Sequence, residues 1–102
     1  MGGISIEFGK DIHRYTAELG YWLGEPYWNR GLMIEAVKLM KDYAFDTFPQ
    51  LQRLYSVPFS NNLSSARVLE KVRFQCEGRL RKSVVNRDGK FLDEFVYSVV
   101  RE

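Results

Sequence analysis

The stretch AELGYWLGEPYWNRGLMIEAVKLMKDYAF, residues 17–45, decides the fold, because its pattern changes from that of a strand to that of a helix. Residues 17–23 alternate apolar side chains with others, the period of two that is typical of a β-strand. A proline and two glycines within residues 24–31 interrupt the strand and predict a loop. From Arg30 onward apolar residues recur at helical spacing, which predicts an amphipathic helix. The positions expected to face the core are Met33, Ala36, Val37, Met40, Tyr43 and Ala44.

The junction between this strand and this helix favours an anion. A helix start presents backbone N–H groups without intrahelical partners, and it carries the positive end of the helix dipole. Here that start follows the carboxyl end of a strand, with Gly31 in the turn that leads into the helix. Phosphate groups are the commonest ligands of such a junction. The pattern therefore predicts a phosphate-binding loop.

The same stretch resembles the acetyl-CoA-binding segment of the GNAT family of N-acetyltransferases, in particular the ribosomal-protein N-terminal acetyltransferases. The family signature is Gln/Arg-x-x-Gly-x-Gly/Ala, and the matching residues here read W-N-R-G-L-M. Gly31 is kept, whereas Trp28 and Met33 depart from the strict pattern. The wider phrase GYWLG-x-P-Y-W-x-x-G-x-M-x-E-A carries the resemblance more specifically than the six-residue signature.

A second motif supports the same resemblance. Residues 62–74, NLSSARVLEKVRF, are similar to the family pattern N-x-x-S-x-x-x-L-E-K-x-G-F. Arg73 stands where the family usually has the glycine that ends the helix in the left-handed conformation. A non-glycine residue adopts that conformation at a cost of about 1 kcal/mol, so strain or an altered helix exit is expected there.

The order of the predicted elements is β-β-α-β-α-β-β. A long helix between two strands predicts that those strands are parallel neighbours. The fold class is therefore α/β (α+β), with a GNAT-like mixed sheet. Because family domains normally carry further strands and helices before this point, the resemblance implies one partial acetyl-CoA-binding domain over residues 1–102. The expected strands are residues 1–8, 17–23, 51–59, 74–85 and 91–100, and the expected helices are residues 30–45 and 63–72.

Composition excludes several other classes. A formal charge of +2 does not indicate a nucleic-acid partner, and no apolar run approaches the roughly 20 residues of a membrane span. His13 and Cys76 are the single histidine and cysteine, too few for a zinc site, so no metal is expected. The G-x-S-x-G elbow of a serine hydrolase is missing. One cysteine allows no intrachain disulfide, which is compatible with the reducing cytoplasm.

The resemblance implies a reaction and a co-substrate. Acetyl-CoA would give its acetyl group to a primary amine, either a protein N-terminus or a small molecule, by direct attack. Backbone groups of one strand would hold the pantetheine arm and the thioester, and amides around the helix start would hold the pyrophosphate. The strand residues are Tyr21, Trp22 and Leu23, and the amides are those of Asn29, Arg30, Gly31, Leu32 and Met33.

Proton transfer needs further residues. Glu18 is the preferred general base because its strand runs to the thioester, and Asp93, Glu94 or water are the alternatives. Asn62 and Ser65 match family positions near the pantetheine and the sulfur. Ser65 could hydrogen-bond the departing thiolate or satisfy local backbone, and Asn62 caps its helix under either interpretation.

Three features favour a different class of protein, a truncated acyl-CoA-binding or interaction module without activity. The start at Met1 omits the helices that, in the resembled family, normally form the binding wall for the acceptor. The position where ribosomal-protein enzymes usually carry a glutamate is Val84, and no tyrosine lies within residues 60–74 to protonate the thiolate. The strand of residues 1–8 should also form an exposed sheet edge. Exposed edges pair readily, so a homo-oligomer is expected.

Overall fold

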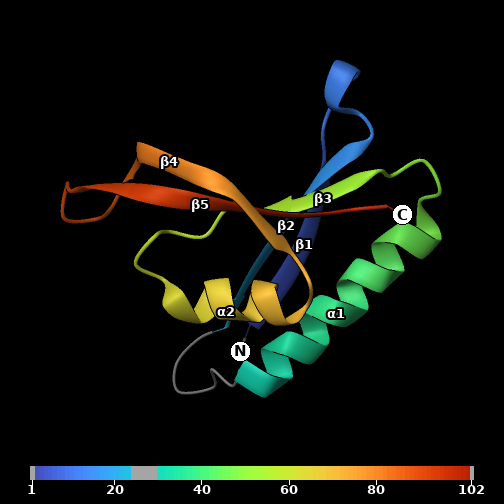
Figure 1. The fold of residues 1–102 in the computed structure, drawn as a ribbon, viewed down its shortest axis with the longest axis horizontal. Helices are drawn as coiled ribbons and strands as arrows, with labels where there is room; N and C mark the ends of the chain where they lie inside the picture. Colours follow the sequence, from blue (N-terminus) through green and yellow to red (C-terminus); the bar gives the residue numbers. More distant parts are fainter. Residues whose placement is uncertain (1, 24–29, 102) are drawn as a thin grey trace.

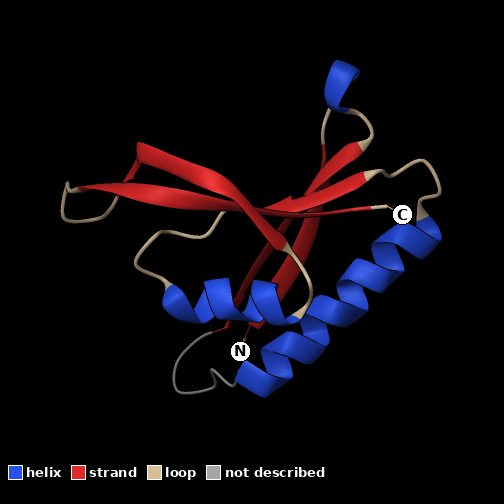
Figure 2. Cartoon of the chain, in the orientation of Figure 1, coloured by secondary structure: helices blue, strands red, loops and turns tan. Residues whose placement is uncertain are grey.

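The computed structural model describes the backbone of residues 2–23 and 30–101, and the side chains of residues 5–20 and 31–101. The elements follow the predicted β-β-α-β-α-β-β order, with one additional 3-10 turn, η1 (Figures 1 and 2). The mixed α and β class is thereby confirmed. None of the described helices is both long and apolar enough to span a membrane. In chain order the elements are β1 Gly2–Phe8, η1 Asp11–His13, β2 Thr16–Leu23, α1 Arg30–Thr47, β3 Arg53–Ser56, α2 Leu63–Lys71, β4 Gln75–Val85 and β5 Phe91–Val100.

The five strands form one mixed sheet in the order β1-β2-β3-β5-β4. β2 and β3 are parallel neighbours joined through α1, as the strand–helix–strand pattern predicts. The other pairs, β1–β2, β3–β5 and β4–β5, are antiparallel. In this sheet β1 and β4 are the edge strands.

Both long helices lie on one face of the sheet (Figures 1 and 2). Ala17 and Leu54 project from the sheet into the core and are fully buried. They belong to the same buried cluster as Val37 of α1 and Leu69 of α2. The opposite face is left uncovered by the elements that the structure describes, and it is this face that matters for the site.

Six positions of α1 were predicted to face the core, and for Tyr43 this prediction is wrong. Its side chain is 56% exposed, whereas Met33, Val37 and Ala44 are buried. Tyr43 lies about 120° around the helix from Val37, at the border of the buried stripe, because successive residues are about 100° apart. It packs at its ring edge on Phe48 instead, with the ring centroids 6.4 Å apart.

β3 is shorter than the strand predicted over residues 51–59. It ends at Ser56, and Pro58 cannot donate a ladder hydrogen bond. The Pro58 carbonyl still accepts from the Phe95 N–H at 3.0 Å, and Phe59 forms an isolated bridge with Glu94. The predicted loss of regular pairing at the proline is confirmed.

The exit of α2 has the predicted left-handed residue. Arg73 has φ 76°, and its N–H donates to the Glu70 carbonyl at 3.1 Å. The Phe74 N–H donates to the Leu69 carbonyl at 3.0 Å and closes the turn. A non-glycine residue thus holds the glycine conformation at the helix end, with the strain that this implies.

Candidate active site

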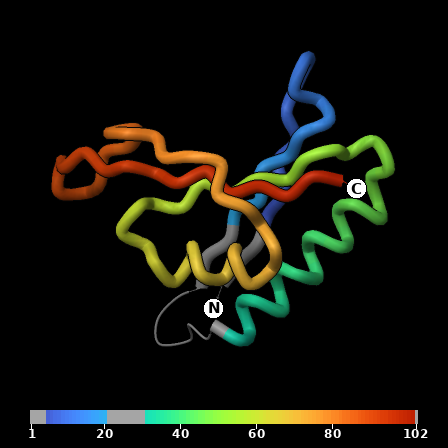
Figure 3. The backbone as a smooth tube through the Cα atoms, viewed as in Figure 1, coloured from blue at the N-terminus to red at the C-terminus, as the bar shows by residue number. Residues whose placement is uncertain are grey.

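β2 and β3 separate partway along their length. They pair only from Thr16↔Arg53 to Glu18↔Tyr55, although β2 continues beside β1 to Leu23. Beyond Glu18, no strand in the described part of the chain pairs with the β3 side of β2. The tube after β3 turns away toward α2 (Figure 3). Two parallel strands therefore splay apart and leave a gap between them.

A cleft of about 460 Å³ occupies this gap. Its walls come from β2, from the segment after β3, and from the start of α2. Three of the side chains singled out from the sequence, Glu18, Asn62 and Ser65, meet in this cleft although they lie up to 47 positions apart. The lining residues are Glu18, Leu19, Gly20, Ser56, Val57, Pro58, Phe59, Asn62 and Ser65.

Asn62 builds the floor of the cleft by capping α2. Its Oδ1 accepts a hydrogen bond from the Ser65 N–H at 3.2 Å, the pattern expected of an N-cap asparagine. This bond fixes the first turn of α2, and the Ser65 side chain in that turn is 9% exposed. The cap therefore holds Ser65 at the cleft wall.

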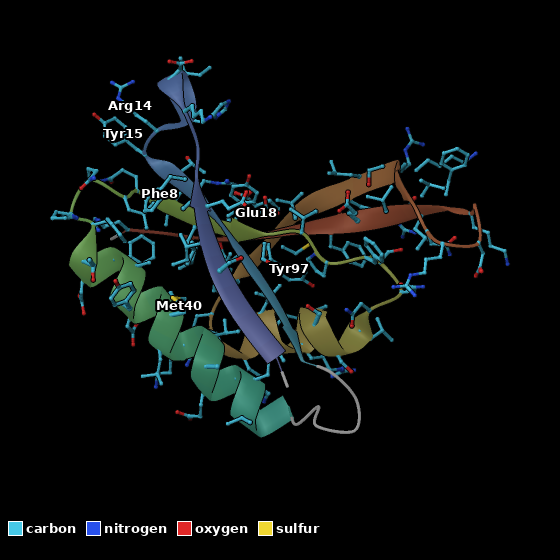
Figure 4. All side chains as sticks on the ribbon, turned by 180° about the vertical axis from the view of Figure 1, so that it is seen from behind. Phe8, Arg14, Tyr15, Glu18, Met40 and Tyr97 are labelled. Atoms are coloured by element: carbon cyan, nitrogen blue, oxygen red, sulfur yellow. The ribbon has the colours of Figure 1, made fainter. Side chains whose placement is uncertain are left out.

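Glu18 lies on the uncovered face of the sheet, at the point where the strands part (Figure 4). It is opposite Glu7 on β1 and Tyr55 on β3. Neither glutamate forms an ion pair with any side chain that the structure describes. The same register continues to Ser98 on β5 and Gln75 on β4, so one polar row crosses the whole sheet at this level.

Tyr55 is a residue that the sequence did not single out. Burial raises the pKa of the Tyr55 phenol, and the negative charges of Glu18 and Glu7 raise it further, while Arg53 opposes them. The phenol therefore stays neutral at physiological pH and keeps a proton that it can donate to a hydrogen bond. In the sequence it lies in a predicted strand, residues 51–59, that is apolar on both sides, so the pattern does not say which face of the sheet Tyr55 occupies.

The alternative bases on β5 lie outside the cleft and have other partners. Asp93 accepts from the Lys82 N–H at 2.8 Å and from Arg79 Nε at 2.6 Å, and these contacts hold the pKa of Asp93 below its usual range. Glu94 accepts from the Ser83 hydroxyl at 2.8 Å. Both carboxylates support a bulge in β4, where the register shifts between Leu80 and Val84.

The residues proposed to hold the cofactor follow the end of β2 and the start of α1. Tyr21, Trp22 and Leu23 lie in β2, where their backbone pairs with β1. Arg30 begins α1. In the first turn Leu32 is 61% exposed and Met33 is buried, with Gly31 exposed beside them. Asn29 and Trp28 lie outside the described residues.

Within residues 2–23 and 30–101, no three histidine, cysteine, aspartate or glutamate side chains gather as a metal-binding group. The chemistry that this cleft offers is that of a carboxylate, a hydroxyl, an amide and backbone groups beside two parted strands.

A splayed pair of parallel strands, with a helix start at the end of one strand and a capped helix at the end of the other, defines a class of ligand-binding α/β proteins. Residues 1–75 match the family model described as acetyltransferase (GNAT) domain. The chain belongs to the GNAT acetyltransferase family.

Individual relatives agree with this assignment. The chain is 45% identical over 69 residues to a Bacillus subtilis protein named probable N-acetyltransferase YjcK, covering 68% of this chain and 38% of that protein. It is 35% identical over 101 residues to the B. subtilis N-acetyltransferase YoaA, itself uncharacterized, covering 99% of this chain and 55% of that protein. The chain thus spans between 38% and 55% of the length of these two relatives.

Solved structures share the fold. The ribosomal-protein-S5-alanine acetyltransferase of Vibrio fischeri superposes with a TM-score of 0.87 at 26% identity, covering 99% of this chain and 54% of that one. The microcin C7 self-immunity acetyltransferase MccE, solved in complex with acetyl-CoA and AMP, gives a TM-score of 0.72 at 28% identity. That comparison covers 85% of this chain and 47% of the other.

Proposed function

We propose that this chain carries the acetyl-transfer site of an N-acetyltransferase, which moves an acetyl group from acetyl-CoA to a primary amine. The observation that carries the proposal is the cleft between the parted strands, where Glu18, Asn62 and Ser65 meet. The acetyl-CoA bound in the structure of MccE supports the choice of co-substrate. The amine belongs to a protein N-terminus or to a small molecule.

The cofactor would enter along β2. Beyond Glu18, the backbone N–H and C=O groups of Tyr21, Trp22 and Leu23 that point away from β1 would pair with the amide groups of the pantetheine arm, because bonding to the partner alternates along an antiparallel strand. The amides of the α1 start would bind the pyrophosphate, because unpaired N–H groups and the helix dipole both favour an anion there. These amides are those of Asn29, Arg30, Gly31, Leu32 and Met33.

The chemistry then needs two proton transfers. The neutral amine attacks the thioester carbonyl carbon, a C–N bond forms, and the C–S bond breaks as the thiolate leaves. Glu18 accepts the proton that the amine nitrogen loses, directly or through water. Ser65 donates a hydrogen bond to the thiolate until a proton from solvent restores the thiol. The roles of Glu18 and Ser65 are proposals that their shared cleft supports.

A second candidate function is acyl-CoA binding without transfer. The observation in its favour is the uncovered face that carries Glu18, because a reaction centre works best when water is excluded. Thiol release from acetyl-CoA in the presence of an amine, measured beside acetyl-CoA affinity, separates the two functions. Binding without thiol release would favour the second.

We also propose a cytoplasmic, self-associating protein with one domain over residues 1–102. The free and exposed thiol of Cys76 supports a reducing compartment. Self-association is supported by the edge strand β1 and by exposed apolar side chains on α1, among them Leu39, which is 66% exposed. Light scattering over a concentration series tests the association.

The test of the co-substrate is Gly31→Glu. The new carboxylate would lie in the first turn of α1, against the place proposed for the pyrophosphate, so acetyl-CoA affinity should be lost while the fold survives. Gly78→Glu adds the same charge on β4, where a side chain at Gly78 meets open space, and should bind normally. Calorimetric titration measures both. If Gly31→Glu binds acetyl-CoA as tightly as the wild type, the pyrophosphate assignment is wrong.

A further inference from the structure

A second cavity lies beside Glu18 on the same uncovered face of the sheet. Its volume is also about 460 Å³. This cavity, bounded by the β1–β2 connection, is more enclosed than the cleft between the strands. The amide, hydroxyl, imidazole and guanidinium groups around it suit a polar ligand. It is lined by Gly9, His13, Thr16, Arg53 and Tyr55.

The β1–β2 connection forms a fixed wall of this cavity. The Gly9 N–H donates to the Thr16 carbonyl at 2.9 Å, and the His13 N–H donates to the Lys10 carbonyl at 2.9 Å. The Gln52 N–H ties the connection to the next strand through the Tyr15 carbonyl at 2.8 Å. Gly9 cannot be replaced without moving the turn, because a Cβ there would lie 2.3 Å from the His13 carbonyl oxygen.

Arg53 supplies the charge of this cavity. Its Nη2 donates to Glu77, and its guanidinium lies over the Tyr55 ring, 4.9 Å from the ring centroid. These two contacts hold the guanidinium in one place. A guanidinium carries five N–H donors, so the bond to Glu77 leaves others for an anion. Carboxylate and phosphoryl groups are the anions that match this fork of donors.

The cavity and the proposed base Glu18 lie at neighbouring positions of the β2–β3 pair. Thr16 pairs with Arg53, and Glu18 pairs with Tyr55, two residues further along both strands on the same face. The backbone positions of the two pairs are thus about 6–7 Å apart along the strands. One end of this surface carries the carboxylates of Glu7 and Glu18, which form no ion pair with any described residue, and the other end carries Arg53 with its partner Glu77. A molecule with an amine at one end and an anion at the other would complement both; bound as ammonium, the amine would lose one proton to solvent before it attacks, so that Glu18 accepts the second.

We propose that the cavity beside Arg53 is the acceptor's anion subsite, and that the acceptor is a small primary amine bearing a carboxylate or phosphoryl group about 6–7 Å from its nitrogen. The amine lies at Glu18 and the anion lies at Arg53. Tyr55, which lines the cavity and neighbours Glu18, is a hydrogen-bond donor between the two ends. The role of this subsite in catalysis rests on the proposed acetyl transfer. Binding of the amine can be measured whether or not transfer occurs.

Binding can be measured through His13, because it is the only histidine in the chain and it lines the cavity. Its ring proton signals are followed by NMR at constant pH, on protein carrying no histidine tag. The probes are 5-aminopentanoate, 4-aminobutylphosphonate and pentylamine, which lacks the anion. The His13 signals should shift saturably with either anionic amine and not with pentylamine. Equal responses to all three, or no response to either anionic amine, would overturn the proposal.

Two variants assign the effect to Arg53. Arg53→Gln should abolish the response of His13 to the anionic amines. Lys10→Gln removes one positive charge from the same turn, outside the cavity lining, and should keep that response. If Lys10→Gln loses it to the same extent as Arg53→Gln, general charge and not the cavity explains the binding, and the subsite is wrong.

Kinetics give an independent readout. With acetyl-CoA, kcat/KM for 5-aminopentanoate should exceed that for pentylamine by about tenfold to a hundredfold, the usual effect of a hydrogen bond to a charged group. The ratio should fall to about one in Arg53→Gln. Transfer to both amines at equal rates would overturn the subsite and leave the proposed function standing. Failure of every amine to release thiol would count against the proposed function, and the His13 titration would then still decide the subsite.

Discussion

The two faces of the sheet differ although the same strands build both. In β2, Ala17 and Leu19 are 0% and 1% exposed under the helices, while Glu18 between them is exposed on the other side. In β3, Leu54 is fully buried and its neighbours Arg53 and Tyr55 face the uncovered side. Because side chains alternate along a strand, adjacent residues contribute to stability and to chemistry separately. Substitutions on the covered face should therefore change stability with little effect on chemistry, and substitutions on the uncovered face should change chemistry with little effect on stability.

The largest effect on activity without an effect on stability is expected for Glu18→Gln. If Glu18 is the base, turnover should fall by about 10²–10⁴-fold, while acetyl-CoA affinity and the midpoint of unfolding stay close to the wild type. The pH profile with an amine of low pKa measures this, because the amine itself then titrates outside the working range. Full turnover across that profile would make Glu18 structural and leave water as the remaining acceptor.

The converse change is Leu54→Ala on the covered face. Loss of a fully buried leucine costs about 2–5 kcal/mol of unfolding free energy, because it removes apolar contacts and leaves a cavity. Leu80→Ala on β4 is the matched control, since Leu80 is 45% exposed, and it should cost much less. Denaturant unfolding followed by circular dichroism measures both. Equal losses of unfolding free energy in Leu54→Ala and Leu80→Ala would contradict the view that the covered face carries the stability.

A smaller effect is expected at Tyr97, whose hydroxyl donates to Glu70 Oε2 at 2.9 Å between β5 and α2. Burial and then the Glu70 carboxylate raise the pKa of Tyr97 to about 12. The folded state thus favours the neutral phenol, so this contribution is full below pH 10 and is lost as the pH rises through about 12.

Tyr97→Phe should cost about 1–2 kcal/mol at neutral pH and should weaken the loss of stability between pH 10 and 12. Unfolding at pH 8 and pH 11 measures this. Tyr43→Phe removes an exposed phenol and should leave the alkaline loss in place. An alkaline loss that is unchanged in Tyr97→Phe would rule out Tyr97 as its source.

The smallest effect concerns Ser65, which lines the cleft from the covered side. If its hydroxyl only assists the thiolate, Ser65→Ala should lower turnover by the value of one neutral hydrogen bond, about 0.5–1.5 kcal/mol. The neighbouring Ser64→Ala serves as control, because Ser64 does not line the cleft. A fall in stability with normal turnover would show that Ser65 serves the helix and not the reaction.

Local patterns were enough to predict much of the fold. The change of period within residues 17–45 predicted β2 and α1, and the crossover rule predicted the parallel pair β2–β3. Asn62 was predicted as a cap from its residue type alone. Arg73 was predicted to be strained from its departure from a glycine, and its φ of 76° agrees.

The remaining features depend on contacts between distant segments. Residues 51–59 are apolar on both sides, so the sequence gives no sign that Tyr55 faces away from the helices or that Arg53 meets Glu77, 24 positions later. Tyr43 fits the helical spacing but lies at the border of the buried stripe, which only the docking angle of α1 decides. Glu18, Asn62 and Ser65 could be named individually, whereas their common cleft depends on where β3 ends.

The short pairing between β2 and β3 also affects how the molecule opens. Three residue pairs join the β1–β2 hairpin to the rest of the sheet, whereas seven pairs join β1 to β2. Local opening should begin where the fewest hydrogen bonds must break, so the amide hydrogens that bond β2 to β3 should exchange with solvent faster than those that bond β1 to β2. A ligand between the two strands would bridge both parts of the sheet. By mass action it would then slow this exchange, and the melting temperature would keep rising with the logarithm of the ligand concentration above its dissociation constant.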